Sequence, residues 1–178
     1  MPYSLFLYAD DKKNLSFSKT ELIEQLTELE FISSSVDSLN LQAGNNLMDF
    51  ITFLGCSPSL KLGEVESTIK VHFFNRITGL GGESIETIRY PGCKHPIPDP
   101  ALLLKQFPAT TNWQCKDCGL KGETKTINWR KSAGFSNLFI EIKHIFPKEA
   151  VPSDKLLNTL HSYTQQQWKW FYSKAIPD

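Results

Sequence analysis

A chain of 178 residues is long enough to bury one full hydrophobic core, and we expect a single domain over 1–178. Apolar residues make up 40% and charged residues 21% of the chain, which is typical of a soluble globular protein. The net charge of zero gives no overall reason to expect a nucleic acid or an anionic membrane as partner. No apolar run approaches the roughly 20 residues that span a bilayer, and the N-terminus lacks the basic segment of a signal peptide. We therefore expect a cytoplasmic protein that makes no membrane contact and keeps its cysteines reduced.

The N-terminal third predicts one strand and two helices. Residues 3–8 are apolar and aromatic, and they predict a short strand. Ser18 and Glu21 have the spacing of a capping box, and apolar residues then recur at helical spacing, which predicts a helix over 19–31. A second short helix is predicted over 45–54.

The middle of the chain predicts a hairpin. Residues 67–76 alternate between the two sides of a strand. The glycine-rich loop 78–84 follows, and a second strand is predicted from there to residue 90.

The C-terminal third predicts two strands and a long helix. The strands are predicted over 124–129 and 138–146, and the helix over 154–173 after the capping residue Ser153. Four aromatic residues at the end of that helix cannot all face one core, because consecutive helical positions lie about 100° apart. Strands are grouped rather than alternated with helices, so we expect an α+β fold. It has a mainly antiparallel sheet, two N-terminal helices, a C-terminal helix and a metal-binding insertion.

The strongest chemical signal is a set of four metal ligands in one short segment: Cys93, His95, Cys115 and Cys118. Thiolates and neutral imidazole are the ligands that zinc prefers in tetrahedral sites. Four protein ligands leave no open position for water or substrate. The sequence therefore predicts one structural zinc ion rather than a catalytic one.

The segment 91–122 resembles a zinc ribbon. The C-K-D-C-G sequence that begins at Cys115 is similar to a ribbon knuckle, with Gly119 permitting its tight turn, and C-K-H from Cys93 takes the place of the other knuckle. The resemblance implies a zinc-binding sub-module over 91–122. The first pair departs from the usual pattern, because one residue separates its ligands instead of two. Zinc ribbons include nucleic-acid binders, protein-binding modules and structural braces, so the resemblance does not assign a function.

Two other interpretations of the cysteines remain open. One is a set of reduced surface thiols with no metal. The other is a redox-active pair at Cys115 and Cys118, although such pairs gain acidity from a following helix that this sequence does not predict. Cys56, outside the cluster, is interpreted as a small buried residue.

A small binding protein with a protein partner is the function that these features favour. The alternative is a nucleic-acid-binding protein that acts through a basic zinc module. Residues 89–132 carry eight basic and three acidic side chains, whereas residues 1–70 carry five basic and ten acidic. Trp113 and Trp129 lie among the cations, and this mixture is typical of single-stranded nucleic-acid binding.

A second alternative is an enzyme with a site near His72, His144 and the glycine loop 78–84. Both histidines lie in predicted strands, and histidine is the side chain best suited to proton transfer near neutral pH. No carboxylate is placed by the sequence to orient them. Histidines packed in the core or at a sheet edge are the competing interpretation.

Overall fold

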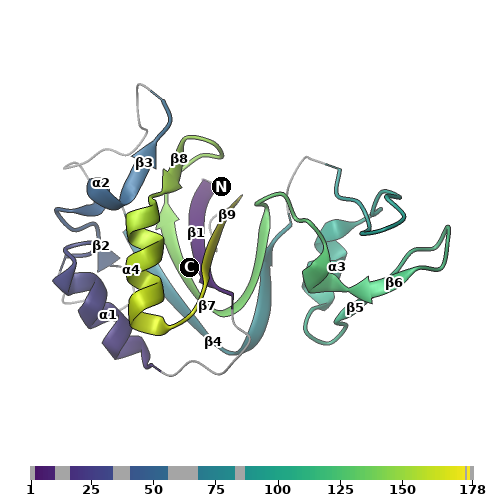
Figure 1. The fold of residues 1–178 in the computed structure, drawn as a ribbon, viewed down its shortest axis with the longest axis horizontal. Coiled ribbons are helices and arrows are strands. Elements are labelled where there is room, and N and C mark those ends of the chain that lie inside the picture. The colour runs from purple at the N-terminus through teal and green to yellow at the C-terminus, as the bar shows by residue number, and fades with distance from the viewer. Residues whose placement is uncertain are drawn as a thin grey trace.

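A five-stranded antiparallel sheet forms the centre of the molecule, as the computed structural model shows (Figure 1). The structure describes residues 3–10, 17–33, 41–55, 68–82, 87–174 and 176. In spatial order the strands are β2 (Leu41–Gln42), β4 (Thr68–Gly81), β7 (Ala133–Lys143), β1 (Tyr3–Ala9) and β9 (Trp168–Lys174). Neighbouring strands of this sheet pair antiparallel throughout its described residues. The predicted α+β class with a mainly antiparallel sheet is therefore confirmed.

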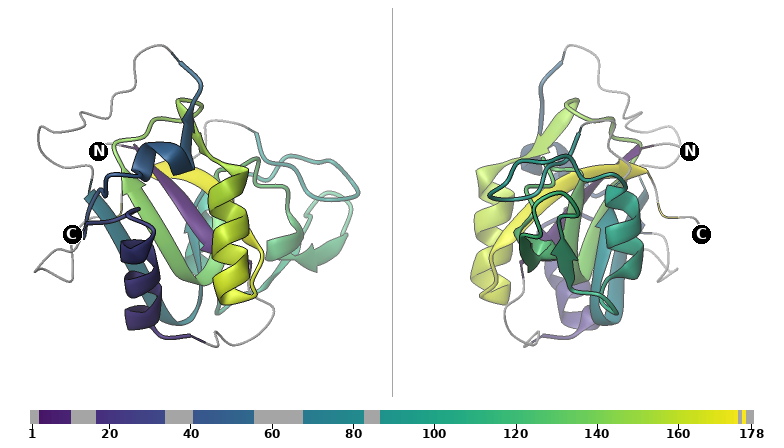
Figure 2. Two further views of the ribbon diagram at one scale, coloured as in Figure 1. Left: turned by 60° about the vertical axis from the view of Figure 1, so that its left-hand side comes forward. Right: turned by 90° about the vertical axis from the view of Figure 1, so that its right-hand side faces the viewer.

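One face of this sheet carries the main hydrophobic core. Helices α1 (Lys19–Glu28) and α4 (Asp154–Thr164) lie on that face (Figure 2). Alternate residues of the central strands point toward them and are buried, including Leu5, Leu7, Leu138, Ile140 and Ile142. The period of two in these strands separates that face from the opposite one, on which Phe6, Phe139 and Phe171 form a smaller buried cluster.

The first helix forms as predicted, although it ends at Glu28 and not at residue 31. The backbone N–H of Glu21 donates to the Ser18 hydroxyl at 3.2 Å, and the Glu21 carboxylate accepts the Ser18 N–H at 2.6 Å. Both halves of the capping box are therefore present.

The predicted helix over 45–54 is wrong in its second half. A four-residue helix, α2 (Leu47–Phe50), leads directly into strand β3 (Ile51–Phe53), which pairs with β8 (Ala150–Pro152). Isoleucine, threonine and phenylalanine favour a strand, and β8 supplies the partner. Apolar spacing alone does not reveal that partner, which lies about a hundred residues further along the chain.

The predicted helix over 154–173 is also wrong in its second half. Helix α4 ends at Thr164, because Gln165 adopts a left-handed conformation with φ of 55°. The aromatic residues that follow lie on β9 and pair along the whole of β1. In a helix these aromatic residues could not all face one core. In a strand they alternate, so that Trp170 and Tyr172 point to the helix-covered face and Phe171 points to the other.

The predicted hairpin around the glycine loop is wrong as well. Gly79 and Gly81 lie inside β4, whose far end pairs with β7 after an irregularity between Phe73 and Thr78. Close approach explains these glycines: a Cβ on Gly79 would lie 2.9 Å from a Leu104 methyl, and one on Gly81 would lie 2.2 Å from the Ser132 oxygen. The loop residues 83–86 lie outside the described part of the chain, and no strand is assigned within 87–90.

The other two strand predictions also need correction. The predicted strand over 124–129 is a single 3₁₀ turn (Thr124–Thr126), and the indole N–H of Trp129 donates to the Thr124 oxygen at 3.1 Å across it. The predicted strand over 138–146 exists as β7, but it begins at Ala133 and ends at Lys143.

Residues 87–132 form a separate lobe at the far end of β4 and β7, which we call the knuckle module (Figure 1). It contains helix α3 (Pro100–Gln106) and strands β5 (Asn112–Gln114) and β6 (Lys121–Glu123). Together with Phe135 of β7 it has its own hydrophobic core, made largely of Ile88, Tyr90, Ile97, Leu104, Phe107, Trp113, Ile127 and Trp129. Among the described helices of the whole chain, none is long and apolar enough to cross a membrane.

Candidate metal centre

The four predicted ligands meet at one point of the knuckle module. The ligand atoms of Cys93, His95, Cys115 and Cys118 all lie within 4.8 Å of one another. Cys93 and His95 come from the turn after Tyr90, and the other two come from the turn between β5 and β6. Two turns that are distant in sequence therefore face each other across a single site.

The first turn is shaped by backbone hydrogen bonds and left-handed residues. The Tyr90 N–H donates to the His95 oxygen at 3.0 Å, and the Lys94 N–H donates to the Tyr90 oxygen at 3.2 Å. Gly92 has φ of 84° and Lys94 has φ of 62°. The left-handed conformation at Lys94 turns the chain sharply between the two ligands. This explains how a pair with one intervening residue serves in place of a usual knuckle.

The second turn has the form predicted from the sequence. Its closing bonds run from the Cys115 N–H to the Leu120 oxygen at 2.8 Å and from the Gly119 N–H to the Cys115 oxygen at 2.9 Å. Gly119 adopts φ of 75°, a region that favours glycine, so its predicted role in the turn is confirmed.

The donor set fits one tetrahedral metal ion. The Cys115 Sγ and His95 Nδ1 atoms are 3.4 Å apart. Around zinc, with Zn–S near 2.3 Å and Zn–N near 2.0 Å, a tetrahedral edge between sulfur and nitrogen is about 3.5 Å. The three cysteines are free thiols. The cluster can therefore hold a metal ion with four protein ligands, a closed arrangement that suits a structural role.

The neighbours of Cys115 favour the ionised form of its sulfur. Burial opposes ionisation, but hydrogen bonds from the backbone of Cys118 and Asp117 and from the His95 and Cys118 side chains outweigh it and lower the pKa of the Cys115 thiol to about 7. The Leu120 backbone favours the Cys118 thiolate, yet desolvation and the neighbouring sulfurs prevail and raise the pKa of Cys118. Because metal ligands must be deprotonated, binding releases protons and strengthens as the pH rises.

Aromatic side chains pack beside the two turns that carry the cluster. The rings of Tyr90 and Trp113 lie 4.9 Å apart between centroids, and the Trp113 indole donates to the Glu123 oxygen at 3.0 Å. Gly122 must lack a side chain, because a Cβ there would lie 2.6 Å from the Trp113 ring. Trp113 and Trp129 are both buried in the module core, so their faces are occupied by protein rather than presented for base stacking.

The other predicted site residues do not converge. His72 lies opposite Phe139 in the register of β4 and β7. His144 follows the last residue of β7, five positions beyond Phe139, or about 17 Å along an extended strand. Residues 78–82 of the glycine loop belong to β4 and its end, while residues 83 and 84, like Cys56, lie outside the described part of the chain.

Sequence reasoning missed Glu141, the carboxylate that contacts His72 at 2.8 Å. The signal was present, because Glu141 is a charged residue between two apolar neighbours in a strongly apolar strand, and such a residue points to the other face. Its partner cannot be found from local pattern, since 69 positions separate the two residues.

Comparison of the chain with protein-family models, with curated protein sequences and with solved structures returns no significant match. The likeness to a zinc ribbon thus rests on the residues and geometry of the two turns alone.

Proposed function

We propose that this chain is a cytoplasmic binding protein in which one structural zinc ion stabilises the knuckle module, and that the module presents the binding surface. The observation that carries this proposal is the closed set of four ligand atoms within 4.8 Å of one another, in a lobe beyond the main sheet. We treat 1–178 as a single domain with the module as its extension, since β4 and β7 run continuously between the two lobes.

A structural role for zinc is supported by how little regular structure the module has. Its two strands are three residues long each, and its longest helix has seven residues. Such short elements make few backbone hydrogen bonds, so a metal that joins the two turns would supply folding free energy directly. Zinc is favoured over harder cations because three of the four ligands are sulfur.

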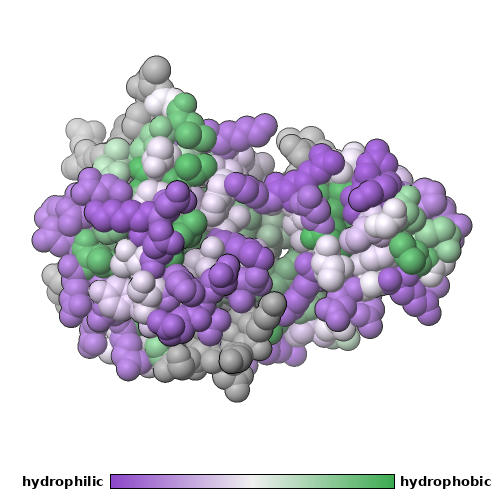
Figure 3. Space-filling model, viewed as in Figure 1, coloured by the Kyte–Doolittle hydropathy of each residue, from purple (hydrophilic) through white to green (hydrophobic). Residues whose placement is uncertain are grey.

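A binding role is supported by the charge on the module surface. All of its basic side chains are exposed: Arg89, Lys94, Lys105, Lys116, Lys121, Lys125, Arg130 and Lys131. Three exposed carboxylates oppose them, and a zinc ion with three thiolates adds a net charge of about −1. Leu120 is 44% exposed beside the metal turn, and Figure 3 shows hydrophobic surface at the outer end of the lobe. An apolar side chain amid cations suits a protein partner with an acidic surface.

Nucleic acid is the second candidate partner, because the same excess of cations would attract phosphates. The burial of both module tryptophans argues against the stacking that single strands require. We therefore prefer the protein partner.

The test combines metal analysis with nucleic-acid titration on the purified full chain. We expect about one zinc per chain after gentle purification, and no measurable binding of single-stranded or duplex oligonucleotides at physiological salt. Absence of metal, or iron in its place, would refute the zinc assignment. Tight binding with a steep salt dependence would move the assignment to nucleic acid.

A further inference from the structure

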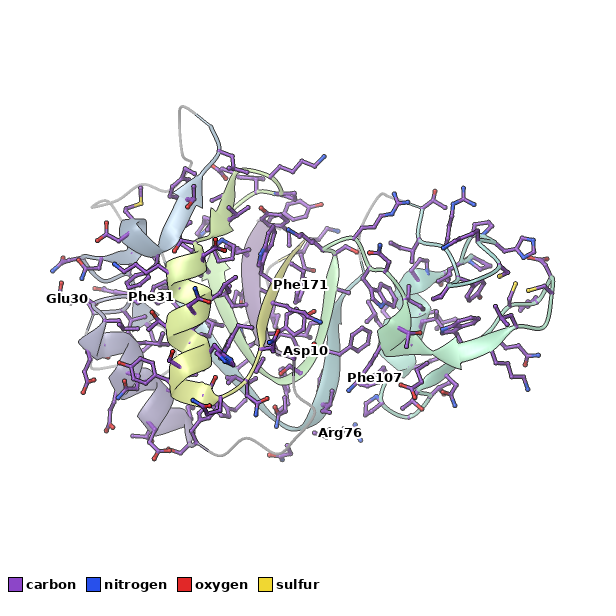
Figure 4. The ribbon with its side chains drawn as sticks, in the orientation of Figure 1. Asp10, Glu30, Phe31, Arg76, Phe107 and Phe171 are labelled. Carbon is purple, nitrogen blue, oxygen red and sulfur yellow. The ribbon has the colours of Figure 1, made fainter. Side chains whose placement is uncertain are left out.

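One side of the metal cluster is open to solvent, and the other side packs into the core of the knuckle module. Cys115 is fully buried and belongs to that core, whereas Cys118 is exposed and the His95 side chain is 44% exposed. Figure 4 shows yellow sulfur atoms at the outer end of the lobe, with Phe107 labelled at the side nearer the main sheet. Access to the cluster is therefore from the side of His95 and Cys118.

Asp117 places a carboxylate on this exposed side. It lies between the two cysteines of the second turn, and its side chain is 67% exposed. Its Oδ2 atom lies 3.9 Å from the Nδ1 atom of His95 and 3.9 Å from the Sγ atom of Cys115. The carboxylate thus approaches ligands from both turns, although it is not among the four residues whose ligand atoms lie within 4.8 Å of one another.

These distances place the carboxylate just outside the ligand shell of a metal ion. With Zn–O near 2.1 Å, Zn–S near 2.3 Å and Zn–N near 2.0 Å, an oxygen ligand lies about 3.0–3.6 Å from the other ligand atoms of the same ion. The Asp117 oxygen is less than about 1 Å beyond that range from both His95 and Cys115. A small rotation of an exposed side chain covers that distance, and zinc sites can expand to five ligands.

Asp117 also approaches the ring nitrogen of His95 that faces the cluster. A carboxylate that only orients a metal-binding histidine contacts the ring nitrogen on the side away from the metal. Here Nδ1 is the atom that lies close to both the Cys115 sulfur and the Asp117 carboxylate. Asp117 therefore lies next to the position where a metal ion binds and does not support the ring from outside it.

We propose that Asp117 is an auxiliary ligand that binds the metal ion as it enters and leaves the cluster, an inference that rests on the proposed zinc site. On entry, the carboxylate oxygen bonds to the hydrated ion and displaces one water molecule. A thiolate of the cluster then replaces the oxygen, and the thiol proton goes to solvent. On release the same bonds break and form in the reverse order. The ion keeps its charge, no redox change occurs, and the four predicted ligands hold the ion at equilibrium.

The test measures zinc release from the full, zinc-loaded chain to the chromogenic chelator 4-(2-pyridylazo)resorcinol. Asp117→Asn keeps the backbone N–H and the size of the side chain but replaces the anionic oxygen with a weaker donor. We expect this variant to release zinc about tenfold more slowly, at the low end of what groups outside the ligand set contribute. Zinc affinity, measured by equilibrium competition with the same chelator, should stay unchanged, because uptake slows by the same factor.

Two further variants separate the oxygen donor from its charge. Glu123→Gln is the matched control, because it removes an exposed carboxylate at the end of β6 that lies away from the second turn. It should release zinc at the wild-type rate. Asp117→Glu keeps an oxygen donor and should release zinc faster than Asp117→Asn. With cobalt(II) as a spectroscopic probe, wild type and Asp117→Asn should show the same tetrahedral spectrum, since Asp117 is not a permanent ligand.

The proposal is overturned if Asp117→Asn releases zinc at the wild-type rate or faster, or if Glu123→Gln slows release as much. A changed cobalt spectrum or loss of zinc binding in Asp117→Asn would also overturn it, because Asp117 would then be a permanent part of the site. A wild-type chain that holds one zinc but fails these tests refutes this inference alone. A wild-type chain that holds no zinc refutes the proposed function as well.

Discussion

The main sheet and the knuckle module differ in the length of their strands and in the size of their hydrophobic cores. The main sheet has strands of up to 14 residues and a core that draws on two helices and the central strands. The module has three-residue strands and a small core built around two tryptophans. Large buried apolar area stabilises the first region, whereas we propose that a metal ion linking its two turns stabilises the second. If that proposal holds, loss of the metal should loosen the knuckle module and leave the main sheet folded.

Removing one ligand should give the largest effect and confine it to the module. Cys118→Ser should abolish stoichiometric zinc, because structural zinc sites contribute on the order of 10 kcal/mol and a closed site needs all four ligands. Amide exchange measured by NMR should accelerate across residues 87–132 and stay slow in β1 and β7. The matched control is Cys56→Ser, which should retain the metal. Equal loss of structure in both variants would contradict the ligand assignment.

A cavity in the main core should destabilise the main sheet and leave zinc binding by the knuckle module unchanged. Ile140 is fully buried on the helix-covered face of β7, and Ile140→Ala should cost about 2–5 kcal/mol of the free energy of unfolding. The variant should still bind one zinc per chain below its unfolding transition. Urea unfolding followed by circular dichroism, with metal analysis of the same samples, checks this. Loss of zinc in the folded variant would show that the two regions do not behave separately.

High pH should weaken the main sheet through Tyr8. Burial and, to a smaller extent, the charge of Asp10 raise the pKa of the Tyr8 phenol to about 12. An unfolded tyrosine ionises near pH 10. Its contribution to stability is therefore full below about pH 10 and is lost between about pH 10 and 12. Tyr8→Phe should lose less stability than the wild type over that range, as urea unfolding at several pH values would show. Tyr163→Phe, at an exposed position, serves as the control and should follow the wild type.

The smallest expected effect lies where the two regions meet. The Lys131 ammonium lies 3.4 Å from the centroid of the Trp170 ring, and the Tyr172 N–H donates to the Lys131 backbone oxygen at 3.0 Å. Lys131→Ala removes the cation–π contact but keeps the backbone bond, so we expect a loss of about 0.5–1 kcal/mol in the unfolding of the main sheet. Lys125→Ala removes a longer contact of the same kind, 5.7 Å from Phe107 inside the module, and should leave the main sheet unchanged. If Lys125→Ala lowered the free energy of unfolding of the main sheet more than Lys131→Ala does, the assignment of the Lys131–Trp170 contact to the main sheet would be wrong.

Local chemistry explains what the sequence predicts correctly. The capping box at Ser18 and Glu21 involves residues three positions apart, and the turn at Gly119 needs only glycine at a left-handed position. The cluster of Cys93, His95, Cys115 and Cys118 is recognisable because cysteine and histidine are rare and occur here at metal-binding spacing. These signals are contained within a few residues, so the cluster and the α+β class can be predicted without knowledge of the rest of the fold.

The features that sequence reasoning predicted wrongly or missed depend on pairing between strands that are distant in sequence. Residues 168–174 carry aromatic side chains that fit either a helix or a strand, and only the free edge of β1 made them a strand. The glycines at Gly79 and Gly81 are typical of a turn, but the close approach of the Leu104 side chain and the Ser132 backbone explains their place inside β4. The contact of His72 with Glu141 exists because β4 and β7 pair in one register across a 69-residue separation. Which distant strands pair, and in what register, depends on packing over the whole chain, and so on the tertiary structure alone.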